Sequence, residues 1–267
     1  IIQGVRFYCI HHSDTRGGEE SKCDYLRNRE IQLFHLENNQ LRSLDKNFQR
    51  KTMTNVSSQI MVVDYGMGNL RSIQFKLERE GICSQISSDP QEISKAPLLI
   101  LPGVGHFAKA MNNLKDKGLI DVLNNKVLED KTPIMGICLG VQLFTKFSEE
   151  GNVKGLAWIN AVTKKFDFSR GDLNLKIPNI GWHSLDIKNS CPFFKGIPSD
   201  HKFYFVHSYH LCCENQEDVL ATARYGYEYC AAIRHENIFG VQFHPEKSHR
   251  LGFQMIINFI REHLGYG

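Results

Sequence analysis

The residues best suited to chemistry are a cysteine flanked by glycines. Gly136, Cys138 and Gly140 form a Gly-x-Cys-x-Gly sequence at the end of the apolar run 133–137, and helical spacing follows. A sharp strand-to-helix turn of this kind exposes a nucleophile, and the small residues let strand and helix pass closely. The start of the helix favours a thiolate, and the N–H of Leu139 would lie where an oxyanion forms. The pattern predicts a nucleophilic cysteine; a buried structural thiol is the alternative.

A nucleophilic cysteine needs a general base, and His244 is the best candidate among the twelve histidines. It follows the apolar run 239–243, and catalytic side chains project from strand ends in α/β sheets. Glu246 lies two residues later, where it can share a face with His244 and fix its tautomer. His207 is the competing base, but no carboxylate lies near it in sequence, so we interpret it as a pocket or structural residue.

A glycine-rich turn, Pro-Gly-Val-Gly at 102–105, ends the apolar run 98–101. It can be a simple tight turn, or it can aim backbone N–H groups into a pocket as part of an oxyanion hole. It is not a phosphate-binding loop, because no Gly-Lys-Ser/Thr follows it. Gly66 and Gly68 do not make a dinucleotide fingerprint, because the third glycine and the downstream acidic residue are missing. The sequence therefore predicts no cofactor.

The composition is that of an ordinary globular enzyme. The 267 residues are 42% hydrophobic and 23% charged, with a net charge of +3. No window of about 18 apolar residues and no dense Lys/Arg stripe is present, so we expect neither a membrane span nor nucleic-acid binding. The eight cysteines lack a CxxC pair, and the adjacent Cys212 and Cys213 have no partner at zinc spacing. We therefore expect structural thiols, no metal site and a reducing, cytoplasmic location.

The elements that must position these residues begin at residue 59. Apolar runs ending in turn residues predict buried strands at 60–65, 83–86, 98–101 and 133–137. Helical spacing predicts intervening helices at 69–81, after Asp89-Pro90, up to about residue 130, and at 139–149. The second half is strand-rich, with extended segments expected at 158–168, 177–187, 203–211, 220–225, 231–234 and 239–243, and a final amphipathic helix at 250–264.

This order of elements predicts an α/β fold with a mostly parallel central sheet flanked by helices and an antiparallel second half. The domain is expected to span residues 59–267. Residues 1–58 are rich in charge, Asn and Gln and show no sustained hydrophobic period. We interpret them as an N-terminal appendage without the main activity, with a small accessory element as the alternative.

These motifs, in this order, resemble the class I, or triad, glutamine amidotransferases. The marks of that superfamily are the elbow continued to Gln142 and the late His-Pro-Glu at 244–246. Other strings are similar to the glutaminase subunit of imidazole glycerol phosphate synthase, namely Asp-Tyr-Gly-Met-Gly-Asn at 64–69, Gly-Trp at 181–182 and His-Pro-Glu-Lys-Ser at 244–248. The similarity covers essentially all of 61–267 and none of 1–58.

The resemblance implies a Cys-His-Glu triad. Cys138 attacks the side-chain amide of glutamine, His244 carries the protons and Glu246 orients His244. The N–H groups of Val104 and Leu139 are implied to form the oxyanion hole. The residues implied to hold glutamine are Gly103, Gln142, His207, Ser208 and Tyr209.

The resemblance also implies a partner. Ammonia would pass to a (βα)8-barrel cyclase subunit in a heterodimer, which makes imidazole glycerol phosphate for histidine biosynthesis. Met67, Asn69 and Lys247 are implied to lie at the interface. In this family the glutaminase is nearly silent until the partner's substrate binds, and we expect the turn 102–105 to be the two-state element of this coupling.

Two departures from the family pattern leave the ammonia acceptor open. His183 stands where the family usually has Asn, and His210 follows Tyr209 in place of another residue type. Similar chains that occur beside surface-polysaccharide genes feed ammonia to a sugar amidotransferase, which is the alternative acceptor. A non-catalytic scaffold is a hypothesis from another class, but all three triad residues are present. The remaining hypothesis is a stand-alone hydrolase of glutamyl compounds.

Overall fold

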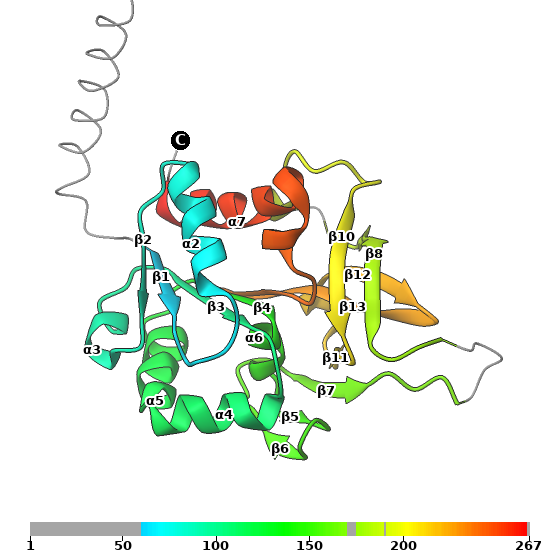
Figure 1. The fold of residues 1–267 in the computed structure, drawn as a ribbon, viewed down its shortest axis with the longest axis horizontal. Helices are drawn as coiled ribbons and strands as arrows, with labels where there is room; N and C mark the ends of the chain where they lie inside the picture. Colours follow the sequence, from blue (N-terminus) through cyan, green and yellow to red (C-terminus); the bar gives the residue numbers. More distant parts are fainter. Residues whose placement is uncertain (1–59, 170–174, 190, 266–267) are drawn as a thin grey trace, which may run out of the picture. The chain divides into compact units, whose positions relative to one another are not determined.

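The computed structural model describes residues 60–169, 175–189 and 191–265. The predicted appendage 1–58 lies outside the described residues, so its role stays a prediction. Within the described ranges, the strands form a large mixed sheet of 12 strands and a separate sheet of two (Figure 1). No helix in these ranges is long and apolar enough to cross a membrane.

One half of the large sheet is parallel, in the order β2-β1-β3-β4-β14. The bounds of these strands are β1 (Ile60–Val63), β2 (Ser84–Ser87), β3 (Leu99–Gly103), β4 (Ile134–Cys138) and β14 (Ile238–Val241). The four strands predicted in the first half of the chain are therefore confirmed. The strand predicted at 239–243 joins them from the far end of the sequence.

Helices cover both faces of this parallel half (Figure 1). Ile60 and Val62 pack in one hydrophobic core with α2 and α7, whereas Met61 and Val63 pack in a second core with α4 and α5. Successive side chains of a strand point to opposite faces, so a strand covered on both sides must be apolar throughout. The helices are α2 (Leu70–Arg79), α3 (Pro90–Ile93), α4 (Phe107–Asp116), α5 (Leu119–Asn124) and α7 (His249–Leu264).

The other half of the large sheet is mostly antiparallel, as predicted, and continues from β14 through β13, β11 and β7 to β5 and β6. Its strands are β5 (Phe147–Ser148), β6 (Val153–Lys154), β7 (Ala161–Lys165), β9 (Asp186–Ile187), β11 (Tyr209–Cys213), β12 (Val219–Tyr225) and β13 (Tyr227–His235). The separate sheet is an antiparallel pair of β8 (Asn179–Ser184) and β10 (Lys202–His207).

The helix predicted at 139–149 is wrong in its length. The structure has a five-residue helix, α6 (Leu139–Leu143), because the chain folds back immediately afterwards. The hydroxyl of Thr145 donates to the carbonyl of Gln142 at 2.8 Å. The last carbonyl of the helix accepts from the backbone N–H of Leu156 at 2.8 Å, a partner distant in sequence that local spacing does not reveal.

Three other predicted elements are interrupted. The extended segment predicted at 177–187 breaks at Leu185 into β8 and β9, which belong to different sheets. The extended segment predicted at 203–211 breaks at Ser208 into β10 and β11, which belong to different sheets. The long helix predicted up to residue 130 breaks at Gly118, whose φ of 65° is left-handed and ends α4. It resumes as α5 and closes with a π-helical turn at Asn125–Glu129. A glycine in the left-handed region is a common way to stop a helix.

Candidate active site

Cys138 occupies a strained turn between a strand and a helix. It is the last residue of β4, and α6 begins at the next residue. Its φ of 55° and ψ of −110° form a backbone conformation that costs energy for any residue with a side chain. An added Cβ would lie 2.6 Å from the Phe144 ring at Gly136, and 1.7 Å from the Leu101 carbonyl oxygen at Gly140. The flanking glycines are therefore required by the close passage of strand and helix.

His244 and Glu246 form a buried pair beside this turn. β14 runs parallel to β4 with Val241 opposite Ile137, so both chains leave the sheet at the same edge. His244 Nδ1 lies 2.8 Å from Glu246 Oε1, and the two residues are 1% and 8% exposed. Burial alone would lower the pKa of His244, but the neighbouring Cys138 sulfur and the Glu246 carboxylate outweigh it and raise this pKa to about 10.

The glycine-rich turn 102–105 lies on the other side of β4. Gly103 is the register partner of Cys138 in the β3–β4 pair, so the turn begins level with the nucleophile. A Cβ at Gly103 would lie 2.0 Å from the Tyr65 hydroxyl, so the buried strand end admits only glycine. Three neighbouring strands thus end in a glycine turn, a cysteine and a His–Glu pair.

A cavity of about 220 Å³ opens above the cysteine. It brings together most of the predicted site residues, namely Val104, Cys138, Leu139, Gln142, His207, Ser208 and Tyr209. Its remaining lining residues are Gly105, Glu150, Pro178 and Val206. Gly103 belongs to the strand end just before the cavity. His244 and Glu246 are not among the lining residues, but the His244 ring adjoins the Cys138 sulfur. The arrangement offers a nucleophile, a base and a small polar pocket, which is what acyl transfer requires.

Comparison with known proteins identifies the family. The family model described as "Glutamine amidotransferase class-I" matches residues 61–262. The chain belongs to this family. It is 47% identical over 203 residues to the imidazole glycerol phosphate synthase subunit HisH 2 of Methanococcus maripaludis, a match covering 76% of this chain and 99% of the relative. It is 45% identical over 203 residues to subunit HisH 1 of Campylobacter jejuni, with 76% and 99% covered.

A solved structure shares the fold of this class-I glutamine amidotransferase. PurLQS from Thermotoga maritima matches with a TM-score of 0.53 at 19% identity, over 77% of this chain and 100% of that one. Because the identity is this low, the match supports the architecture of sheet and helices alone.

Two residues of the amidotransferase site were not predicted from the sequence. Glu150 lines the cavity and accepts a hydrogen bond from the Phe107 N–H at 2.7 Å. Gln242 donates from its amide to the Cys138 sulfur at 3.8 Å and accepts from Gln142 at 3.0 Å. Gln242 follows β14 two residues before His244, a position that alternation along the strand could have indicated. Nothing in the local sequence marks Glu150.

His207, the competing base, has no carboxylate partner. Its Nδ1 donates to the carbonyl of Tyr209 at 2.8 Å, and its Nε2 lies 3.2 Å from the Asn179 amide. Burial lowers the pKa of His207 to about 3, and the carbonyl of Tyr209 offsets this only in part. A histidine that stays neutral and has no carboxylate behind it fits a structural place beside the pocket better than that of a base.

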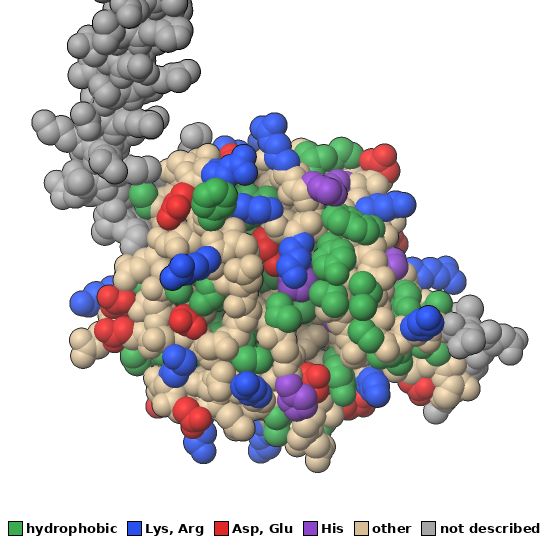
Figure 2. Space-filling view, viewed as in Figure 1, with side chains coloured by type: hydrophobic (Ala, Val, Ile, Leu, Met, Phe, Trp, Pro, Cys, Tyr) green, Lys and Arg blue, Asp and Glu red, His purple; other side chains and the backbone are tan. Residues whose placement is uncertain are grey.

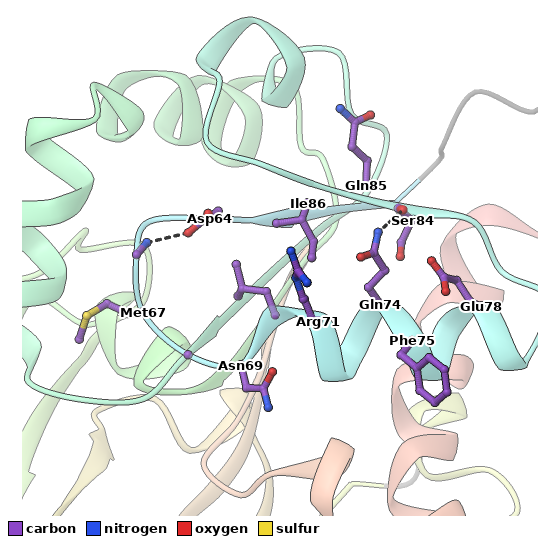
Figure 3. Close-up of a pocket in the computed structure, with 13 residues that line it drawn as sticks. Asp64, Met67, Asn69, Arg71, Gln74, Phe75, Glu78, Ser84, Gln85 and Ile86 are labelled. Atoms are coloured by element: carbon purple, nitrogen blue, oxygen red, sulfur yellow. Dashed lines mark hydrogen bonds between the residues drawn. The ribbon is translucent and has the colours of Figure 1, made fainter.

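The residues predicted at a partner interface lie outside the cavity. Met67 is 9% exposed and its methyl group packs against Gly105, whereas Asn69 caps the start of α2 by accepting from the Ser72 N–H. Met67 and Asn69 line a broad surface hollow along α2 and β2, in which Asp64 accepts from the Gly66 N–H (Figure 3). That hollow contains none of the triad residues.

The described residues contain no cluster of three or more His, Cys, Asp or Glu side chains placed to hold a metal ion. The adjacent Cys212 and Cys213 are free thiols on β11, far along the sheet order from β4. Cys212 contacts His210 Nδ1 at 3.8 Å.

Proposed function

We propose that this chain is the glutaminase subunit of an imidazole glycerol phosphate synthase. It would hydrolyse glutamine to glutamate and pass the ammonia to a cyclase subunit of the (βα)8-barrel type in a heterodimer. The observation that carries this proposal is the juxtaposition of Cys138 with His244–Glu246 at the ends of adjacent strands. The high identity to named HisH subunits over nearly their whole length supports the choice of acceptor.

The first half of the proposed reaction is attack by Cys138 on the side-chain amide of glutamine. A protonated His244 next to the sulfur favours the thiolate, which is the nucleophile. The carbonyl oxygen becomes an oxyanion in the tetrahedral intermediate, where the N–H groups of Val104 and Leu139 would stabilise it. His244 then gives its proton to the departing nitrogen, and ammonia leaves behind a thioester on Cys138.

The second half releases glutamate. His244, now neutral, takes a proton from a water molecule as that water attacks the thioester carbonyl. The carbon–sulfur bond breaks and the thiolate of Cys138 returns. Glu246 holds Nδ1 of His244 throughout, so that Nε2 faces the reacting atoms. Besides Glu246, the His244 ring interacts with the Cys138 sulfur, as a group that carries protons for this nucleophile must.

The cavity has groups that suit glutamine. Glu150 places a carboxylate in the lining, where it would attract the α-ammonium group of the substrate. Its Oε2 already accepts from the first N–H of α4, so the carboxylate is held in place before binding. Gln142, Ser208 and Tyr209 supply further polar groups to the lining.

The surface that would receive the cyclase lies beside the triad. Ile180 and Trp182 on β8 are 60% and 41% exposed, and hydrophobic side chains gather on this face of the molecule (Figure 2). Lys247 follows Glu246 directly and lies over the ring of Tyr204, which also contacts Trp182. An apolar patch with a cation at its edge is typical of a protein interface. Docking here would keep the released ammonia next to the partner.

Glutamine hydrolysis by the full chain tests the proposal. It is measured with the chain alone, with a histidine-pathway cyclase subunit, and with that subunit plus its ribonucleotide substrate. We expect strong stimulation only in the last mixture, since the resemblance implies coupling between the two sites. No stimulation, with Cys138 still alkylated by a glutamine-mimic label, would overturn the histidine-pathway acceptor and direct the test to sugar amidotransferases.

A further inference from the structure

A line of buried hydrogen bonds begins on strand β8, on the side opposite its exposed residues. His183 Nε2 donates to Asn179 Oδ1 at 2.8 Å. The Asn179 amide nitrogen lies 3.2 Å from Nε2 of His207 and 3.3 Å from the Tyr229 hydroxyl. Asn179 is completely buried, so each of its polar atoms needs such a partner. Strand β8 therefore supports the His207 ring on its Nε2 side, through Asn179.

The same line continues to the nucleophile through a shared carbonyl. His207 Nδ1 donates to the carbonyl oxygen of Tyr209 at 2.8 Å, and the amide nitrogen of Gln142 donates to that same oxygen at 3.0 Å. The Gln142 nitrogen also donates to Gln242 at 3.0 Å. Gln242 in turn donates to the Cys138 sulfur at 3.8 Å.

The partners fix the protonation of His207. A carbonyl oxygen can only accept, so Nδ1 must carry the proton that is donated to Tyr209. Nε2 then accepts from Asn179, and the ring is neutral. The lowered pKa of His207, about 3, means that this state persists over the whole physiological range.

The partners also fix the orientation of the Gln142 amide. Its nitrogen carries two protons, and one goes to the Tyr209 carbonyl while the other goes to Gln242. The amide oxygen is the group left to meet a ligand in the cavity that Gln142 lines. A rotated amide would place its oxygen against the Tyr209 carbonyl, where two acceptors would repel each other.

We propose that His207 is a positioning residue for the glutamine pocket: by donating to the Tyr209 carbonyl, it helps keep the Gln142 amide oxygen turned toward the N–H groups of the substrate. Asn179 and His183 hold the His207 ring in place. This inference rests on the proposed glutaminase activity. It assigns His207 to substrate affinity rather than to proton transfer.

The test compares two variants of His207. In each, a side-chain amide replaces one of the two ring nitrogens. In His207→Asn the amide nitrogen takes the place of Nδ1, so the bond to Tyr209 is kept. In His207→Gln the amide takes the place of Nε2, so the bond to Asn179 is kept and that to Tyr209 is lost. We expect His207→Gln to raise KM for glutamine about tenfold with kcat within about threefold of native, and His207→Asn to stay near the native KM. Equal KM values for the two variants, or the reverse order, would overturn the proposal.

His210 provides a matched control. It is also buried, it also bonds a backbone carbonyl and a tyrosine hydroxyl, and it packs against the same Phe166 ring. Its partners are the Leu211 carbonyl, the Tyr227 hydroxyl and the Cys212 sulfur, and none of them bonds the Gln142 amide as the Tyr209 carbonyl does. His210→Gln should therefore lower thermal stability about as much as His207→Gln does, but without changing KM for glutamine. A tenfold rise in KM in this variant would show that any disturbed histidine under the pocket has the same effect.

A second measurement tests the role of His207 without the partner subunit. Cys138 is alkylated with the diazoketone analogue of glutamine, and the concentration giving the half-maximal rate is compared between native chain and variants. Asn179→Leu, which leaves the reacting residues intact, should raise this concentration about threefold because the His207 ring loses its support. An unchanged value in both Asn179→Leu and His207→Gln would overturn the positioning role. Failure of the native chain to be alkylated would instead overturn the proposed function itself.

Discussion

The two halves of the site are positioned by different means. At the edge of the parallel strands, the register of adjacent backbones places Gly103 opposite Cys138, and β14 ends beside Ile137, three residues before His244. Beyond them, β8 and β10 form a sheet of their own, and side-chain hydrogen bonds from His207 and Gln142 to the Tyr209 carbonyl link it to β11 and α6. Backbone register leaves little freedom, whereas a side-chain line can be altered one bond at a time. The positions of the reacting groups therefore depend on the backbone of the large sheet. The shape of the substrate pocket depends on the side-chain hydrogen bonds from Asn179 through His207 to Gln142.

Substitutions in the triad should abolish the function of the reacting groups at the ends of the parallel strands. Cys138→Ala and His244→Ala are expected to reduce glutamine hydrolysis by at least about 10⁴-fold, because nucleophile and proton carrier act as one unit. Glu246→Gln should cost roughly 100-fold less than either, since it removes orientation and charge stabilisation but leaves the imidazole. Initial rates with saturating partner and substrate measure all three.

Cys230→Ala is the control for the loss of a buried thiol. Cys230 is 7% exposed and lies on β13, in the antiparallel half. Its replacement should leave hydrolysis within about twofold of native. A larger loss for Glu246→Gln than for His244→Ala would contradict the assignment of roles, and an unfolded Cys138→Ala would make that cysteine structural.

The pH dependence of stability should separate the two histidines, because their pKa values move in opposite directions from 6.5. The pKa of His244 is raised to about 10, so its stabilising effect is complete below pH 6.5 and is lost as the pH rises toward 10. The pKa of His207 is lowered to about 3, so the native state loses stability as the pH falls from 6.5 toward 3. Each contributes at most about 1.4 kcal/mol per pH unit.

Urea unfolding from pH 4 to pH 10 measures both effects. Cys138→Ala removes a group that raises the pKa of His244, so the alkaline loss should still begin near pH 6.5 but end at lower pH and become smaller. His207→Asn should flatten the acid side and leave the alkaline side unchanged. Native curves that are flat above pH 6.5 would contradict the buried, charged His244.

The smallest effect is expected from removing residues 1–58. Both halves of the site lie within the described residues, and the family match begins at residue 61. We expect kcat and KM of the shortened chain to stay within about twofold of the full chain in the partner-stimulated assay. A folded but inactive product would show that the segment is an accessory element rather than an appendage.

Much of the parallel half could be predicted because its signals are local. Continuous apolar runs mark β1, β3 and β4, and the glycines around Cys138 mark the strand-to-helix turn. The place of Glu150 could not be predicted in this way, because it is fixed by a contact with a residue 43 positions away in sequence, and such contacts leave no spacing pattern. Alternation along the strand could have indicated Gln242, but not its contact with the Cys138 sulfur, 104 positions away.

The amino-acid sequence by itself determined the nucleophile turn, the His-Pro-Glu segment and the succession of strands along the chain. Each of these depends on residues close together in the chain. Tertiary structure alone decided where the segment 203–211 breaks and which state His207 adopts. Both depend on which strands pair and what is buried beside them. His244 and His207 both lie at strand ends, yet a carboxylate neighbours one and a backbone carbonyl the other. Burial with those partners favours a charged ring in His244 and a neutral one in His207.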